Sequence, residues 1–196
     1  MGPDALRRVF VHPARPSSDF DLNPAMVLPM ARVLRPAAVL VAVWDRPDGA
    51  HVVLTKRASH LKHHPGQIAF PGGKIDDGDA GPEAAALREA REEIGLNADL
   101  VTVIGRLPAH ETVTGFNVIP ILGHISADFT AVPEAGEVEE VFSVPLSHLI
   151  EPANYYIEKR LWRGEWRRYY TVPFGPYYIW GATARILRGL ADGVRP

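Results

Sequence analysis

Residues 88–96 read Arg-Glu-Ala-Arg-Glu-Glu-Ile-Gly-Leu, and they close a stretch, residues 80–95, that is rich in helix-forming residues. Asp79 precedes this stretch as a candidate N-cap, and Gly95 is typical of the residue at which a helix ends. At about 100° per residue, three apolar side chains share one face: Leu87, Ala90 and Ile94. The pattern predicts an amphipathic helix that packs on the body of a domain.

Another face of this predicted helix carries three neighbouring carboxylates. Glu89 lies three residues before Glu92 and four before Glu93, so all three fall within an arc of roughly 100°. Like charges at this spacing destabilise a helix, and Arg88, four residues before Glu92, offsets part of the repulsion. A hard cation with oxygen ligands, Mg²⁺ or Mn²⁺, would neutralise the rest. On the helix alone, a solvated face with salt bridges is the more common explanation.

A tight turn, Phe70-Pro71-Gly72-Gly73, comes shortly before the helix. Its glycines leave backbone carbonyls and amides accessible, so a carbonyl there could complete an oxygen coordination shell beside the acidic face. Glycines also let a phosphate group approach the backbone closely. The turn and the helix together favour a metal-assisted phosphate site over a merely solvated helix.

This combination resembles the Nudix box. The family pattern runs from a glycine, here Gly73, through an acidic residue to the sequence Arg-Glu-apolar-any-Glu-Glu-any-Gly-apolar, which residues 88–96 match at every specified position. The first half departs in two ways. Asp79 stands where the family has glutamate, and eight residues instead of seven separate it from Arg88.

The resemblance extends from about residue 36 to residue 190 and is closest to the coenzyme A pyrophosphatases of this family. The extra residue within the box is common in that subfamily. The matching segments upstream and downstream are Leu54-Thr55-Lys56-Arg57, Leu61, His64, Gly66-Gln67-Ile68, residues 70–73, residues 115–120, residues 137–142 and residues 179–184. The resemblance implies an α/β fold, a Nudix-type α/β/α sandwich with a mixed β-sheet. It also implies hydrolysis of a nucleoside diphosphate linked to another group.

The resemblance assigns roles residue by residue. Its metal ligands, for Mg²⁺ or Mn²⁺, would be the carboxylates of Glu89, Glu92 and Glu93 and the carbonyl of Gly72. Arg88 would orient the glutamates instead of contacting substrate. The catalytic base is a box glutamate or an acid from a distant loop. Outside the box we favour Glu137, which precedes an expected strand, and keep two alternatives, Glu140 and Glu111. For each of the three, an ordinary surface acid is the more common explanation.

Residues of the loop before the box are the candidates for substrate binding. Arg57, Lys62 and His64 can meet phosphate, Gln67 can donate a hydrogen bond, and Gly73 permits close approach. Three histidines there, His60, His63 and His64, have a spacing that could suit zinc, but Pro65 opposes a helix and the chain has no cysteine. The aromatic side chains of the C-terminal third are expected in the core or an interface instead of an adenine-stacking site.

The remaining elements are expected from hydrophobic patterns. The continuous apolar run 37–44 is typical of a buried strand that pairs with residues 51–55 across a turn. Further strands are expected at 68–70, 100–104, 116–125 and 138–144, a helical turn at 145–149, a hairpin of 155–162 with 166–172, and a helix over 181–190. Residues 1–35 form an arm packed on a Nudix domain of residues 36–196.

Composition narrows the function classes. The 196 residues carry a net charge of −2 and no cysteine, which disfavours a general nucleic-acid binder and excludes disulfides. No apolar run approaches the length of a membrane helix, so we expect a soluble cytoplasmic protein. The resemblance implies an enzyme that acts on a small nucleotide such as coenzyme A, and we consider a homodimer. Two alternatives stay open: hydrolysis of ADP-ribose or an oxidised nucleotide, and a non-catalytic nucleotide-sensing module.

Overall fold

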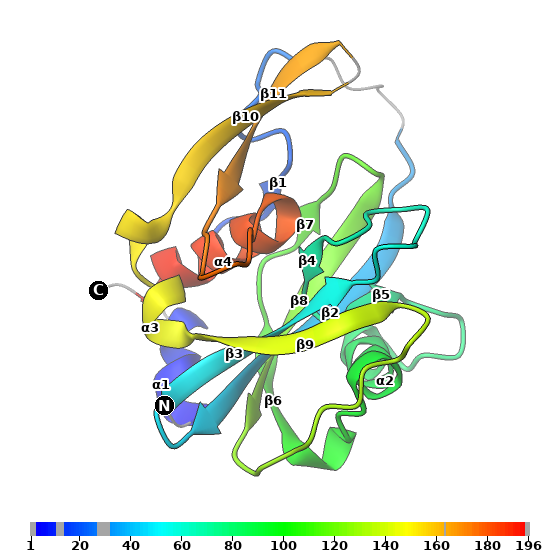
Figure 1. Ribbon diagram of the computed structural model, residues 1–196, viewed down its shortest axis with the longest axis vertical. Coiled ribbons are helices and arrows are strands. Elements are labelled where there is room, and N and C mark those ends of the chain that lie inside the picture. The colour runs from blue at the N-terminus through cyan, green and yellow to red at the C-terminus, as the bar shows by residue number, and fades with distance from the viewer. Residues whose placement is uncertain (1–2, 11–13, 27–31, 163, 195–196) are drawn as a thin grey trace.

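The computed structural model describes residues 3–10, 14–26, 32–162 and 164–194 (Figure 1). In chain order the elements are α1 (Pro3–Arg7), η1 (Arg8–Phe10), β1 (Ser17–Ser18), β2 (Arg35–Arg46), β3 (Gly49–Arg57), β4 (Ile68–Ala69), β5 (Gly72–Lys74), α2 (Pro82–Ile94), η2 (Ala98–Leu100), β6 (Val101–Arg106), β7 (His110–Glu111), β8 (Phe116–Ile125), β9 (Val138–Pro145), α3 (Leu146–Leu149), η3 (Pro152–Asn154), β10 (Tyr156–Trp162), β11 (Glu165–Thr171) and α4 (Gly181–Val194). No described helix is long and apolar enough to cross a membrane.

The described part of the chain contains a nine-stranded mixed sheet with β2 near its middle. Strand β2 pairs in parallel with β8 along its length and antiparallel with both β3 and β5. Strand β9 extends the sheet on β3, and β6 extends it on β8. A separate two-stranded sheet, β10–β11, stands beside α4 (Figure 1).

Side chains of β2 alternate between two cores, one on each face of the sheet. Leu40 belongs to the core under α2, with the buried Ala86 and Ile94 of that helix. Val41, the next residue, belongs to the opposite core, which includes Leu187 of α4. Because helices cover both faces, β2 has no polar face, and its sequence is a continuous apolar run. The expected α/β/α sandwich with a mixed sheet is therefore confirmed.

Most of the expected elements are present with shifted ends, and a few were missed. The helix predicted over 80–95 is α2, but its N-cap is Gly81, so the expected capping role of Asp79 is wrong. Gly95 ends the helix in the left-handed conformation, as expected. The short strands β1, β5 and β7 were not predicted, because two or three residues carry too little periodicity for detection.

The described residues of the N-terminal arm contribute to the core. Leu6 and Val9 are each only 2% exposed and lie in the same apolar cluster as Leu187 of α4. Residues 1–2, 11–13 and 27–31 of the predicted arm lie outside the described part of the chain. The packing makes the first turns of the arm part of the folded unit.

We predict that Leu6→Ala lowers the free energy of unfolding by about 2–5 kcal/mol, because it removes a fully buried side chain and leaves a cavity. Urea unfolding followed by circular dichroism measures the change. Val33→Ala is the matched control, since Val33 is 92% exposed and its truncation should have little effect. Equal stability of Leu6→Ala and the unaltered protein would show that the arm is dispensable to the fold.

Candidate active site

The glycine turn before α2 is held on the central strand. Strand β5 pairs antiparallel with β2, with Gly72 opposite Val39, and the Leu40 N–H donates to the Pro71 carbonyl at 2.8 Å. Gly72 has a φ of +154°, and a Cβ there would lie 2.5 Å from the Ala38 carbonyl oxygen. A side chain at this position would therefore collide with the strand that fixes the turn.

Two carboxylates of α2 reach this turn. The Gly72 N–H donates to Oε2 of Glu93 at 3.1 Å, and Glu93 is 6% exposed. A Cβ on Gly73 would overlap the carboxylate of Glu89. Gly73, predicted as a substrate contact, is therefore also the residue whose missing side chain makes room for Glu89.

The electrostatics of these carboxylates are unfavourable as they stand. Burial raises the pKa of Glu93 to about 7; repulsion by Glu89 and Glu137 adds to this shift, and the Gly72 hydrogen bond and Arg57 oppose it. Burial also raises the pKa of Glu89, although Arg88 opposes this shift. A nearby cation would lower both pKa values by favouring the ionised forms.

Arg88 is the hub that organises the acidic face. Its Nε and Nη2 donate to the two carboxylate oxygens of Asp79, each at 3.0 Å. Its Nη1 donates to Glu89 at 3.0 Å and to Glu92 at 3.1 Å. Its Nη2 also reaches the Lys74 carbonyl at 3.1 Å. Asp79, whose role the altered box left open, thus anchors Arg88 through a bidentate ion pair.

The donor set suits a hard divalent cation in its chemistry. The carboxylates of Glu89 and Glu93 meet at the Gly72–Gly73 turn. Carboxylate oxygens, like the Gly72 carbonyl that the sequence predicts as a ligand, are donors of the kind that Mg²⁺ and Mn²⁺ prefer. Within the described residues, however, no three His, Cys, Asp or Glu side chains are already arranged to hold a metal. Glu92 is turned toward Arg88 with its side chain 60% exposed, so it would have to rotate to join the other two.

The three acids considered as a base outside the box have different surroundings. Glu137 lies close enough to Glu89 and Glu93 to raise the pKa of both, and its carbonyl accepts the Ala58 N–H at 2.8 Å. Glu140 accepts a hydrogen bond from the Tyr177 hydroxyl at 2.5 Å. Glu111 forms an ion pair with Arg32 in the N-terminal arm. Glu137 is the one of these three that interacts with the box.

The predicted substrate contacts at the end of β3 and in the loop between β3 and β4 lie in different surroundings. The backbone of Arg57 exchanges hydrogen bonds with residues 66 and 67, at 3.1 and 3.0 Å, and its charge influences Glu93. His64, in the left-handed conformation with φ of 55°, lines a pocket together with Gln67. Lys62 is exposed and does not line that pocket. The other two histidines considered for zinc, His60 and His63, are exposed as well.

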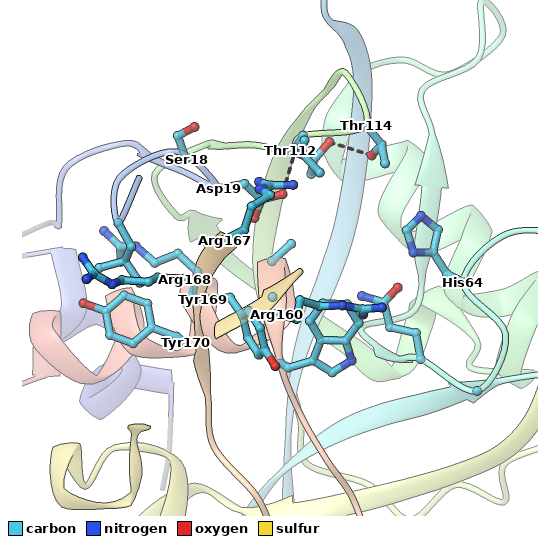
Figure 2. Close-up of a pocket in the computed structure, with 18 of the residues that line it drawn as sticks. Ser18, Asp19, His64, Thr112, Thr114, Arg160, Arg167, Arg168, Tyr169 and Tyr170 are labelled. Carbon is cyan, nitrogen blue, oxygen red and sulfur yellow. Dashed lines mark hydrogen bonds between the residues drawn. The ribbon is translucent and has the colours of Figure 1, made fainter. Parts of the chain in front are cut away.

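That pocket, of about 590 Å³, was not predicted from the sequence (Figure 2). It lies between the His64 loop, the N-terminal arm, the β10–β11 hairpin and the start of α4. Its lining combines cations with aromatic rings: Arg160, Arg167, Arg168, Arg185, Tyr169, Tyr170 and Trp180. The sequence favoured the core or an interface for the C-terminal aromatic side chains. Tyr155 is buried and Tyr170 packs against the core, and the rings of Tyr169, Tyr170 and Trp180 also line this pocket.

The family model of the NUDIX domain matches residues 34–162 of this chain. This range contains the glycine turn and α2 and covers well over half of the sequence, so the chain belongs to the Nudix hydrolase family. The resemblance seen in residues 73–96 is thereby confirmed at the level of the family.

Relatives in several bacteria span most of the chain. An uncharacterized Nudix hydrolase NudL of Enterobacter sp. (strain 638) is 43% identical over 164 residues, which cover 83% of this chain and 85% of the relative. The protein of the same name from Cronobacter sakazakii is 45% identical over 157 residues, with 80% and 81% covered. The crystal structure of RenU, a Nudix hydrolase from M. smegmatis, aligns with a TM-score of 0.51 and 25% identity over 61% of this chain and 82% of that one.

We predict that Arg88→Ala lowers the melting temperature and weakens the rise in melting temperature that Mg²⁺ produces, because Glu89 and Glu92 lose the group that orients them. Differential scanning fluorimetry across a Mg²⁺ titration measures both effects. Arg91→Ala is the matched control, since Arg91 is exposed on the same helix. Unchanged melting and an unchanged Mg²⁺ titration in Arg88→Ala would contradict the role as a hub.

Asp79→Asn should also destabilise the protein, in a pH-dependent way. The hydrogen bond from Arg88 lowers the pKa of Asp79 below its ordinary 3.8. The stabilisation is therefore fully present above that ordinary value and is lost as the pH falls through the lowered one. The difference in melting temperature between the unaltered protein and Asp79→Asn should narrow below about pH 4. A difference that is constant with pH would exclude the ion pair as its cause.

Proposed function

We propose that this Nudix protein hydrolyses the diphosphate of coenzyme A or its derivatives, with Mg²⁺ or Mn²⁺, to 3′,5′-ADP and 4′-phosphopantetheine. The observation that carries the proposal is the course of residues 54–73. At one end this segment, whose sequence resembles the coenzyme A subfamily, places Gly72 and Gly73 against the box carboxylates. In its middle it places His64 and Gln67 in the wall of the large pocket.

This arrangement suits a substrate with a diphosphate near its centre and a nucleotide at one end. The diphosphate would lie at the glycine turn, where backbone groups and Arg57 are close to the glutamates. His64, Gln67 and the exposed Lys62 would contact the substrate on the side of the pocket. A neutral or purely apolar substrate would leave these cations without a counter-charge.

The cation would be held by the carboxylates of Glu89, Glu92 and Glu93 with the Gly72 carbonyl. When bound, it supplies charge neutralisation of the diphosphate and a lowered pKa for water at the site. Arg88, fixed by Asp79, orients Glu89 and keeps Glu92 beside the site, from where Glu92 would rotate to join the other two carboxylates. The Glu137 carboxylate accepts the proton of the attacking water as the general base.

We predict that Glu92→Gln and Glu93→Gln each reduce turnover by orders of magnitude and leave the fold intact. Loss of one charge from a repulsive cluster should not destabilise the metal-free helix. Product formation with Mg²⁺, followed by mass spectrometry, and circular dichroism measure the two effects. Glu83→Gln is the control, because Glu83 lies on the same helix but pairs with Arg106. Activity in excess EDTA, or near-normal turnover by both variants, would refute the metal role.

The substrate is tested by comparing coenzyme A with 3′-dephospho-coenzyme A and ADP-ribose at one Mg²⁺ concentration. A charge-assisted phosphate contact contributes about 1.5–3 kcal/mol. Loss of the 3′-phosphate should then lower kcat/KM by roughly ten- to a hundred-fold. Equal efficiency on the first two compounds would remove recognition of the 3′-phosphate, and a clear preference for ADP-ribose would replace the proposed substrate. Binding of nucleotides without cleavage of any would indicate a sensing module.

A further inference from the structure

The large pocket is built mainly from segments outside the match to the NUDIX family model, residues 34–162. One wall comes from the N-terminal arm around Asp19, another from β11, and a third from the start of α4 at Gly181. The His64 loop, residues 112–114 and Arg160 supply the lining that lies within the matched range. Elements appended to the Nudix domain at both ends of the chain therefore enclose a space next to its substrate loop.

One face of the β10–β11 hairpin presents charge and rings to this space. Arg160 is opposite Arg167 in the strand register, and Tyr169 follows two residues later, so these three side chains share a face. The Arg160 guanidinium lies 5.3 Å from the ring centroid of Trp180, and the Tyr169 and Trp180 centroids are 5.2 Å apart. In Figure 2, His64 and Arg160 lie on one side of β11, and Arg168 and Tyr170 lie on the other.

Within the described part of the chain, some cationic side chains around the pocket are neutralised by nearby carboxylates, and Arg160 is not. Arg185 donates to Asp21 at 3.1 Å. Asp19 accepts the Val113 N–H at 2.8 Å and contacts His110 at 3.2 Å. Among the residues that the structure describes, Arg160 forms no ion pair. Its guanidinium lies over the Trp180 ring. A guanidinium that lies over an aromatic ring keeps its N–H groups available, so beside a cavity it can donate them to a phosphate group.

The pocket lies one short loop away from the box glutamates. Arg57 is hydrogen-bonded through its backbone to Gly66 and Gln67, which line the pocket, and its charge influences Glu93. The His64–Gln67 segment thus lines the pocket. Its neighbour Arg57 is close enough to the acidic face of α2 to influence Glu93. A ligand that extends from the pocket along this loop arrives at the glycine turn.

We propose that this pocket binds the 3′-phosphorylated adenosine end of the substrate, with Arg160 on the 3′-phosphate and the purine against the rings of Tyr169 and Trp180. The proposal rests on the proposed function for the identity of the substrate. Coenzyme A has two dissimilar ends, a phosphorylated purine nucleoside and a neutral, flexible pantetheine chain. Cations and aromatic rings together suit the first, because phosphate needs positive charge and a purine stacks on aromatic faces.

The first test measures binding without catalysis. Isothermal titration calorimetry with 3′,5′-ADP and with 5′-AMP, in EDTA, should show tighter binding of 3′,5′-ADP to the unaltered protein. Arg160→Ala should raise the Kd for 3′,5′-ADP about tenfold or more and leave that for 5′-AMP nearly unchanged. Arg160→Lys should retain part of the preference. Arg160 is exposed, so its truncation is not expected to unfold the hairpin.

Lys159→Ala is the matched control. Lys159 is the preceding residue of the same strand, carries the same charge on the opposite face, and lies over Trp166 outside the pocket. Its loss should leave both Kd values unchanged. Equal Kd values of the unaltered protein for 3′,5′-ADP and 5′-AMP, or equal effects of Arg160→Ala and Lys159→Ala, would overturn the assignment of the pocket.

Kinetics separate this assignment from the proposed function. If coenzyme A is cleaved, Arg160→Ala should lower kcat/KM for coenzyme A about tenfold and leave that for 3′-dephospho-coenzyme A unchanged. If coenzyme A is cleaved and Arg160→Ala does not change the preference for it over 3′-dephospho-coenzyme A, the assignment of the pocket is wrong and the proposed function stands. No cleavage of coenzyme A, together with Arg160-dependent binding of 3′,5′-ADP, would overturn the function but keep the pocket.

Discussion

The contact between the glycine turn and the acidic face of α2 is the constraint on which the candidate site depends. Strand pairing with β2 fixes Gly72, whose N–H donates to Glu93, and the missing side chain of Gly73 makes room for Glu89. Burying two carboxylates against a backbone turn is costly unless a positive charge compensates. The fold therefore keeps a charge imbalance at this point, and metal binding is the chemistry that would relieve it.

Arg88 links this imbalance to the altered Nudix box. Its guanidinium bridges Asp79 to Glu89 and Glu92, so one side chain joins the loop before α2 to the helix surface. Asp79 stands where the family pattern has glutamate, and eight residues instead of seven separate it from Arg88. The bidentate contact with Arg88 is made in this altered arrangement. Asp79 therefore anchors Arg88 in this chain despite the departure from the family pattern.

The two faces of the central sheet carry the candidate site and the pocket on different helices. Beneath one face, α2 carries the carboxylates, and its packing against Leu40 sets their position. On the other face, α4 packs with Leu6 of the arm and begins at the wall of the cationic pocket. Residues inside and outside the match to the family model thus build a pocket that the box itself lacks, and differences in substrate among Nudix proteins are expected to arise from such variable segments.

Local patterns in the sequence determined α2, the buried strand β2, the glycine turn, the β10–β11 hairpin and the family, because each depends on residues close together in the chain. Helical spacing placed Glu89, Glu92 and Glu93 on one face, and the match to the Nudix box made them the predicted metal ligands. Only the tertiary structure joined Asp79 to Arg88, set Glu137 apart from Glu140, and brought Arg160 beside Trp180 in a pocket that His64 also lines. Those contacts join residues from separate elements, and no periodicity or local propensity records which elements become neighbours after folding.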